Sequence, residues 1–337
     1  MRVWEFASAA GGIENHLKLV ADRPLPTAAA KTQHLVQVLA VGLNPVDYKL
    51  AEARIAKLPT TPGLDFAGKI VVPAENSTLV PGTLVYGASS FFNPRTGGGA
   101  LAEYIAVPTE TVAVIPAGLS PVLAGGAPVA AVTAYQAIVP HVKKPGSRVF
   151  INGGSGGTGT YGIQIAKALG AHVTVSCSAA NADLCRSIGA DDVLDYTSRP
   201  VLDQLRDAVA KSGLLYDHVV DFVFSGPELF YQAHTYTAPG AHFVEVAGAP
   251  SLAFGRFAFG AMVLPGFLGG GKRKFTMLTA SVVTEPLDQI AKWIVEGKIK
   301  PVTDQVFPFE QAVEAFRRLK TGRAKGKVIV TVAANAE

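Results

Sequence analysis

The chain has 337 residues, of which 49% are hydrophobic and 17% are charged, and its formal net charge is +4. These values indicate a folded globular protein of about two domains and exclude a disordered chain. The charge excess is small and its one basic block is Lys272-Arg273-Lys274, which is too little for a nucleic-acid-binding surface.

The cysteines and the first residues indicate a reducing compartment. Cys177 and Cys185 are poorly placed as a disulfide framework, and the N-terminus carries Glu5 where a signal peptide needs an apolar run. The uncharged run 117–142 would score as a membrane span, but its prolines and glycines favour buried helices, with Ser120 as N-cap and Pro121 as the first helical residue. We therefore expect a cytoplasmic protein without a membrane segment.

Residues 1–118 have the pattern of a β-rich domain. Apolar and polar residues alternate between turns rich in Gly, Pro and Asn, which predicts short strands at 35–41, 67–72, 83–87 and 99–108. Short strands at this spacing are typical of a partly closed barrel.

From Ser147 onward, strands and helices alternate. Strands are predicted at 149–151, 172–177, 192–194, 217–222, 241–246 and 275–281, with helices at about 181–188, 200–211 and 227–235 between them. This rhythm predicts a parallel sheet with helices on both faces. The apolar segment from Ser251 to Gly271 shows no periodicity and is predicted as a long loop, which lines either a substrate pocket or a partner surface.

The last part of the chain is predicted to return to the first domain through helices at 287–295 and 309–319 and a strand at 327–332. The predicted boundaries are therefore 1–118 for the catalytic domain, 119–281 for a nucleotide-binding domain, and 282–337 for the return.

A glycine-rich turn follows the first strand of the predicted sheet. Gly154, Gly156 and Gly159 match the G-x-G-x-x-G fingerprint between a strand and a helix. In this motif the first glycine permits a tight turn, the second lets a pyrophosphate approach, and the third packs the helix against its strand. A dinucleotide is thus expected at the N-terminus of the helix that follows.

The same segment also contains the motif G-x-S-x-G, from Gly153 to Gly157, which is typical of the nucleophile elbow of α/β-hydrolases. A hydrolase of this kind needs a histidine late in the chain, but the last histidine is His242. The alternative predicts a reactive Ser155.

The end of the second strand favours NADPH over NADH. NAD-specific sites place an acid there to bind the ribose hydroxyls, whereas this chain has Ser176, Cys177 and Ser178. An uncharged, hydroxyl-rich position tolerates the 2′-phosphate.

Taken in order, several segments resemble the medium-chain dehydrogenase/reductase superfamily, most closely its zinc-free quinone oxidoreductase, or zeta-crystallin-like, branch. They are residues 41–47, 62–68, 99–104 and 133–137, the glycine turn, and 326–328. The resemblance implies an α/β fold in which a Rossmann doubly wound parallel sheet is inserted in a GroES-like β-barrel substrate domain.

The resemblance also implies a site without metal. Zinc-dependent relatives have a cysteine, a histidine-glutamate pair and a second cysteine where this chain has Asn44, Leu64-Asp65 and Val129. Without a Lewis acid, hydride transfer is expected at the β-carbon of an enone or a quinone, and Lys49 is the candidate proton donor, with Tyr48 and Asn44 as alternatives.

Cofactor contacts are expected from the turn, from the end of the second strand, and from residues that similar proteins use. In chain order these are Thr133, Gly154, Ser155, Gly156, Gly157, Thr158, Gly159, Ser176, Ser178, Asn181, Tyr196 and Gly248.

The sequence therefore predicts a zinc-independent, NADPH-dependent reductase of quinones or of the C=C bond of α,β-unsaturated carbonyls. Two alternatives stay open: a trans-acting enoyl reductase whose substrate arrives on a carrier protein, and a noncatalytic NADPH-binding protein. Similar proteins are usually homodimers that join through the edge of the nucleotide sheet.

Overall fold

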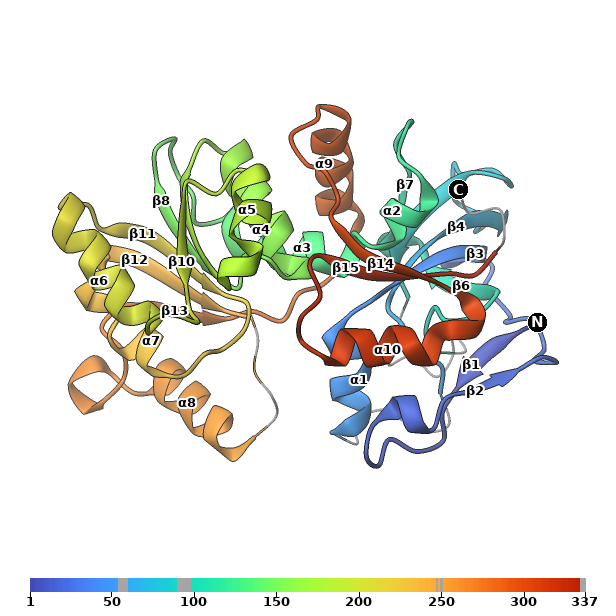
Figure 1. Cartoon of the computed structure of the whole chain (residues 1–337). Coiled ribbons are helices and arrows are strands. Elements are labelled where there is room, and N and C mark those ends of the chain that lie inside the picture. The colour runs from blue at the N-terminus through green and yellow to red at the C-terminus, as the bar shows by residue number, and fades with distance from the viewer. Residues whose placement is uncertain (54–59, 90–97, 247, 249–250, 334–337) are drawn as a thin grey trace. The chain divides into compact units, whose positions relative to one another are not determined.

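The computed structural model describes residues 1–53, 60–89, 98–246, 248 and 251–333 (Figure 1). The chain divides into two units. The first consists of Met1–Val132, Ser281–Gly297 and Pro301–Glu337, and the second of Thr133–Ala280 and Lys298–Lys300.

The first unit is built around β3 (Gln33–Leu43), the longest strand in the described part of the chain. Its first half pairs with β6 (Tyr104–Pro108), its middle with β4 (Asp65–Val72) and its end with β15 (Lys327–Thr331), all antiparallel. One long strand thus connects the N-terminal and C-terminal parts of the chain, as the predicted return required.

The remaining elements extend or cover this sheet. The strands β5 (Leu84–Ala88) and β7 (Val112–Val114) continue it beyond β4, and β14 (Thr303–Pro308) pairs in parallel with β15. A separate pair is formed by β1 (Val3–Glu5) and β2 (Lys18–Val20). The helices of this unit are α1 (Pro45–Glu52), α2 (Pro121–Gly125), α9 (Thr284–Val295) and α10 (Ala312–Lys320).

The units divide later in the chain than the predicted boundary at 118/119. As expected, α2 begins at Pro121 and the Ser120 hydroxyl caps it by accepting the Leu123 N–H. This helix packs on the sheet of the first unit, however, where a Cβ on Gly125 would lie 3.1 Å from the Ala40 carbonyl oxygen. Residues 119–132 therefore belong to the first unit.

The second unit contains a six-stranded, fully parallel sheet in the order β10-β9-β8-β11-β12-β13. Its strands are β8 (Arg148–Asn152), β9 (His172–Cys177), β10 (Asp192–Asp195), β11 (Tyr216–Asp221), β12 (Thr237–Glu245) and β13 (Lys274–Met277). Its helices are α3 (Pro128–Ile138), which begins in the first unit, α4 (Gly157–Ala168), α5 (Ala182–Ser187), α6 (Val201–Ser212), α7 (Glu228–Tyr231) and α8 (Leu252–Val263). The strand order reverses between β8 and β11, and ligands of such sheets bind at this switch point.

The predicted loop from Ser251 to Gly271 is wrong over its first half. Residues 252–263 form α8, and the Ser251 hydroxyl accepts the Phe254 N–H at the helix N-terminus. The helix is apolar on both faces, so its sequence lacks the alternation of polar and apolar residues by which an amphipathic helix is recognised.

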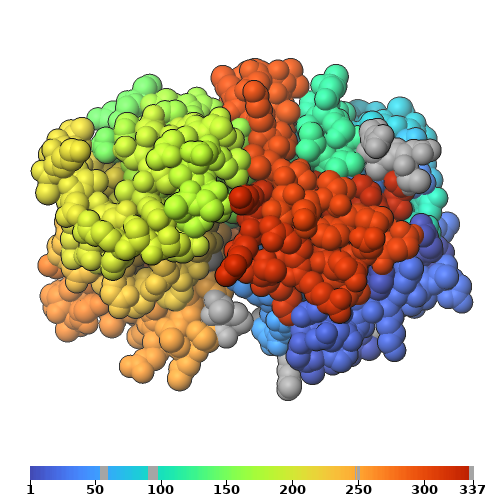
Figure 2. Space-filling view, viewed as in Figure 1, coloured from blue at the N-terminus to red at the C-terminus, as the bar shows by residue number. Residues whose placement is uncertain are grey.

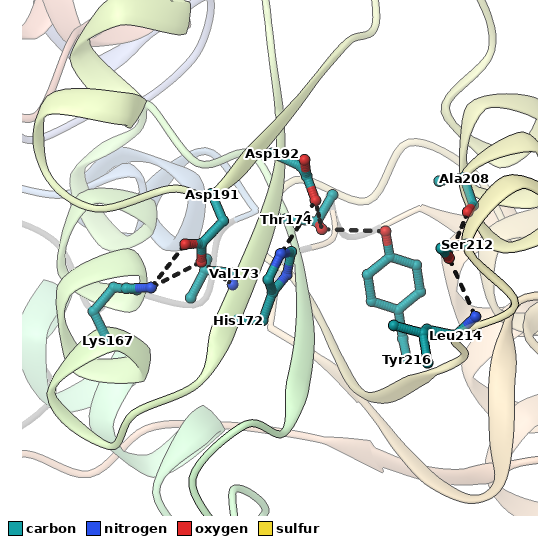
Figure 3. A network of polar contacts seen from close by, with 10 residues as sticks. All are labelled: Lys167, His172, Val173, Thr174, Asp191, Asp192, Ala208, Ser212, Leu214 and Tyr216. Carbon is teal, nitrogen blue, oxygen red and sulfur yellow. Dashed lines mark hydrogen bonds and ion pairs between the residues drawn. The ribbon is translucent and has the colours of Figure 1, made fainter.

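A polar network fixes the outer edge of this sheet (Figure 3). The Lys167 ammonium bonds both carboxylate oxygens of Asp191, which also accepts the Val173 N–H. The Tyr216 hydroxyl donates to Thr174 across the sheet at 3.2 Å. These contacts link α4 to β9 through Asp191 and link β9 to β11, so they support the sheet on one side of the glycine turn.

None of the helices in the described ranges combines the length and the apolar character that a membrane span needs.

Candidate functional site

The glycine turn lies at the carboxyl end of β8. Gly153, and not Gly154, adopts the positive φ (+88°) that the tight turn requires, and a Cβ there would lie 2.6 Å from Val223. A Cβ on Gly154 would lie 2.7 Å from Val175, so its role is close packing on β9. Gly157, Thr158 and Gly159 then form the first turn of α4.

Gly159 is closely packed, whereas Gly156 has open space beside it. A Cβ on Gly159 would lie 2.1 Å from the Gly153 carbonyl oxygen, so α4 packs on the turn as the fingerprint predicts. A Cβ on Gly156 would have its nearest neighbour at 3.7 Å. The turn is thus open at Gly156, beside the free N–H groups of the α4 N-terminus, and this geometry fits a pyrophosphate.

Ser176 supports the turn through three hydrogen bonds. Its hydroxyl donates to the Asn152 side-chain oxygen and accepts the Gly153 N–H at 2.9 Å, and its own carbonyl accepts the Gly154 N–H. The side chain is buried. Its hydroxyl is therefore used within the protein, and the contribution of Ser176 to a cofactor site is to fix the turn.

The other residues expected near the ribose lie on neighbouring loops. Asn181, which precedes α5, donates its amide to the Ser155 hydroxyl at 3.0 Å. Ser178 directly follows β9 and is partly exposed, while Tyr196 follows β10 with an exposed ring. The partner of Ser155 is thus an amide rather than the histidine that a hydrolase nucleophile needs.

Sequence reasoning missed the loop after β11. Asp221 is buried and accepts hydrogen bonds from the Asn152 amide and from the N–H groups of Val223 and Phe224. Burial raises the pKa of this carboxyl. Phe224 has φ +54°, which is unusual for a bulky residue, so the carboxylate holds a strained loop beside the glycine turn. The only sequence signal was an acid at the end of a predicted apolar strand.

Two further predicted contacts come from α3 and from the loop after β12. Thr133 is buried in α3, and Gly248 follows β12. A Cβ on Gly248 would lie 2.1 Å from the ring of Phe254, so this ring covers the glycine closely. A side chain at this position would require the Phe254 ring to move.

In the first unit, Asn44 is the N-cap of α1 and belongs to a buried polar cluster. Its amide donates to Asp65 at 3.0 Å, and the Lys327 ammonium bonds both the Asn44 oxygen, at 2.6 Å, and Asp65, at 3.1 Å. The other oxygen of Asp65 accepts the Val129 N–H. Lys327 comes from β15, so residues from three distant parts of the chain meet around one carboxylate.

Asp47 lies next to this cluster and binds the Asn44 N–H at 2.7 Å. Complete burial raises the pKa of its carboxyl to about 7, and the nearby charge of Asp65 adds to the shift. Burial likewise raises the pKa of Asp65, although the Lys327 ammonium opposes that shift. Asp47 is therefore a buried carboxyl that titrates near neutral pH.

The two other candidate proton donors lie on α1. Lys49 is half-buried, its pKa is lowered by that burial, and its ammonium has no hydrogen bond or ion pair within the described residues. Tyr48 packs against the apolar core with Lys320 5.4 Å from its ring centroid, and burial raises the pKa of its phenol. Asn44 is fully occupied by its cluster, so Lys49 is the most available of the three.

Over the described ranges, no group of three His, Cys, Asp or Glu side chains converges as a metal site would. At the positions compared with zinc-dependent relatives, Asn44 and Asp65 are bonded to the Lys327 ammonium. The absence of a metal stays a prediction.

Comparison with known proteins assigns the family. Residues 30–117 match the alcohol dehydrogenase GroES-like domain, and residues 188–330 match the zinc-binding dehydrogenase model. The chain is 42% identical to the trans-enoyl reductase pgmF of Aspergillus terreus, over 98% of this chain and 96% of that protein. It is 29% identical to the chloroplastic quinone-oxidoreductase QR1 of Triphysaria versicolor, over 98% of both.

Solved structures agree with this assignment. The quinone oxidoreductase from Coxiella burnetii superposes with a TM-score of 0.83 at 27% identity, covering 99% of each chain. The predicted fold, a Rossmann sheet combined with a GroES-like domain, is confirmed by these matches and by the two sheets described above. The chain belongs to the medium-chain dehydrogenase/reductase superfamily, in its quinone-oxidoreductase-like branch.

Proposed function

We propose that this protein is an NADPH-dependent reductase of quinones or of the C=C bond of α,β-unsaturated carbonyls, and that it works without a metal. The observation that carries the proposal is the turn after β8, which is open at Gly156 and leads directly into the N-terminus of α4. The relatives named above are reductases of these two substrate classes, and one neighbouring structure, the Escherichia coli quinone oxidoreductase, was solved as a complex with NADPH.

In this proposal the second unit binds the cofactor. Backbone N–H groups of Ser155, Gly157 and Thr158 would hold the pyrophosphate, and Ser178, Asn181 and Tyr196 would bind the adenosine ribose and its 2′-phosphate. Thr133 and Gly248 would orient the nicotinamide. NADPH supplies a hydride when it is bound.

The first unit then supplies the proton. Hydride addition to the β-carbon of an enone leaves an enolate, which needs a hydrogen-bond donor and a proton at the α-carbon. The ammonium of Lys49 suits this role because burial lowers its pKa and because no carboxylate in the described part of the chain competes for it. Asn44, held by Lys327 and Asp65, fixes the start of the helix that carries Lys49.

Independence of zinc has its own support. Lys327 places a positive charge against the Asp65 carboxylate within a buried cluster, so a metal ion there would meet an ammonium group. A metal assay of the purified protein by mass spectrometry tests this, and activity that is lost with a chelator and restored by Zn²⁺ would contradict it.

The experiment that tests the function is a stopped-flow screen of NADPH and NADH oxidation against quinones, alkenals and enoyl thioesters. Lys49→Ala is expected to lower kcat by about 100-fold while the Kd for NADPH is unchanged. The matched control is Lys69→Ala, at an exposed lysine of β4. Equal kcat in both variants would remove Lys49 from the mechanism, and NADPH binding without turnover on any substrate would favour the noncatalytic alternative.

A second candidate is favoured by the strongest similarity given above. Because the relative at 42% identity is a trans-enoyl reductase, reduction of an enoyl thioester presented by a carrier protein is the narrower form of the same proposal. A cytoplasmic location and a homodimer formed through an edge of the nucleotide sheet complete the proposed description.

A further inference from the structure

The helix α8 buries one face and exposes the other. Phe257 and Ala258 are buried, and the ring of Phe257 lies 5.0 Å from that of Phe224 and 5.6 Å from that of Phe275. The inner face of α8 is thus part of the aromatic core of the second unit. This packing fixes the position of α8, and it therefore fixes which side chains the helix exposes.

The outer face is also apolar. Positions 252, 256, 259 and 263 recur at helical spacing and face solvent, and three of the four are Leu252, Phe259 and Val263. Leu252 is 83% exposed, and Phe267, which follows the helix, is 86% exposed. We call this surface the α8 face; it consists of Leu252, Arg256, Phe259, Met262, Val263, Phe267 and Leu268.

Such a surface is unusual on a protein that is alone in water. A surface helix normally shows polar residues outward, and a contiguous apolar patch of this kind marks an interaction site. The helix lies at the rim of the second unit in Figure 1, and its orange atoms lie on the outside of the molecule in Figure 2.

The charged residues in the segment that carries the α8 face have one sign. The sequence has no acidic residue between Glu245 and Glu285, but it has four basic ones. Arg273 is engaged with Thr237, whereas Arg256, Lys272 and Lys274 make no side-chain hydrogen bond or ion pair among the residues described. A second copy of this face would oppose like charges, while an acidic partner would complement them.

The neighbouring sheet edge favours a protein over a lipid surface. In the described structure β13 pairs on one side only, with β12, so backbone N–H and C=O groups of Lys274–Met277 are free on the other side. A protein can satisfy these groups, but acyl chains cannot.

We propose that the α8 face, flanked by Lys272 and Lys274, docks an acidic carrier protein that presents the enoyl thioester. This rests on the proposed function, in its carrier-bound form. Apolar side chains of the carrier cover Phe259, Met262 and Phe267, and carboxylates around them pair with Arg256, Lys272 and Lys274.

The test compares one acyl group in two forms: crotonyl thioester on a purified acyl carrier protein, and crotonyl-pantetheine free in solution. Arg256→Glu/Lys272→Glu and, separately, Phe259→Ser/Phe267→Ser are measured against Lys69→Glu and Val80→Ser, which change exposed residues of the first unit. Circular dichroism confirms folding of each variant.

The expected result is a KM for the carrier-bound substrate that rises at least tenfold in both α8-face variants, with the KM for crotonyl-pantetheine unchanged. The effect of the charge variant should shrink as salt is raised. The control variants should match the unmodified protein.

Three outcomes would overturn the docking proposal: equal KM values for the carrier-bound substrate in all variants, self-association that Phe259→Ser/Phe267→Ser abolishes, or binding to phosphatidylglycerol vesicles that depends on the same residues. Failure to reduce either thioester would instead count against the proposed function, so the two failures are distinguishable.

Discussion

Two buried aspartates, one in each unit, are stabilised in different ways. Asp65 in the first unit faces the Lys327 ammonium at 3.1 Å, whereas Asp221 in the second accepts N–H groups from Asn152, Val223 and Phe224. Both have a raised pKa because both are buried. A buried carboxylate can therefore be stabilised either by a cation from a distant strand or by N–H groups of its own loop.

The two arrangements serve different purposes in the proposed enzyme. The cation-paired carboxylate joins β4, β15 and the start of α1, the helix that carries Lys49. The dipole-held carboxylate shapes a strained loop beside the glycine turn. Removing one bonding partner of the carboxylate should therefore lower the free energy of unfolding by different amounts in the two units.

The largest effect is expected from Lys327→Met. Loss of the ammonium leaves Asp65 buried without its counter-charge, and breaking a buried pair in this way costs about 3–5 kcal/mol of unfolding free energy. Urea denaturation measures it. Adding Asp65→Asn to Lys327→Met should recover much of the loss; a single variant as stable as the original protein would show that the pair contributes little.

The second-largest effect is expected in the pH dependence of the free energy of unfolding, and it comes from Asp47. Its pKa of about 7 in the folded protein lies above the unfolded value of about 4, so the folded state keeps a proton that the unfolded state has lost. The free energy of unfolding should therefore fall as pH rises from about 4 to about 7, by at most about 1.4 kcal/mol per pH unit from this group, and then level off.

Asp47→Asn should flatten this profile. Urea denaturation of the original protein and of this variant at pH 5, 6, 7 and 8 measures the two slopes. An unchanged slope in Asp47→Asn would assign the titration to another group.

The smallest effect is expected from Asp221→Asn. The amide oxygen still accepts the N–H groups of Val223 and Phe224, and the second carboxylate oxygen has no hydrogen bond among the described residues, so the change should be about 1 kcal/mol or less. The matched Asp65→Asn should cost more, because it leaves the Lys327 ammonium without its carboxylate. Equal losses of unfolding free energy in the two variants would mean that the two carboxylates are stabilised to the same extent.

Local patterns predicted most of the fold. The strand 172–177 is observed with the predicted ends, and the alternation of strands and helices after Ser147 identified the parallel sheet. The fingerprint located the turn but assigned the tight turn to Gly154, whereas the positive φ is at Gly153, which precedes the matched residues. The helix α8 was missed because both of its faces are apolar.

The sequence by itself determined the strand and helix periods and the glycine turn, because each depends on residues that are close along the chain. Only the tertiary structure decided which charged groups meet. Lys327 is far from Asn44 and Asp65 in sequence, and it reaches them because β15 pairs with β3. It also decided that the outer face of α8 is exposed, since burial depends on what packs against a helix and not on the residues within it.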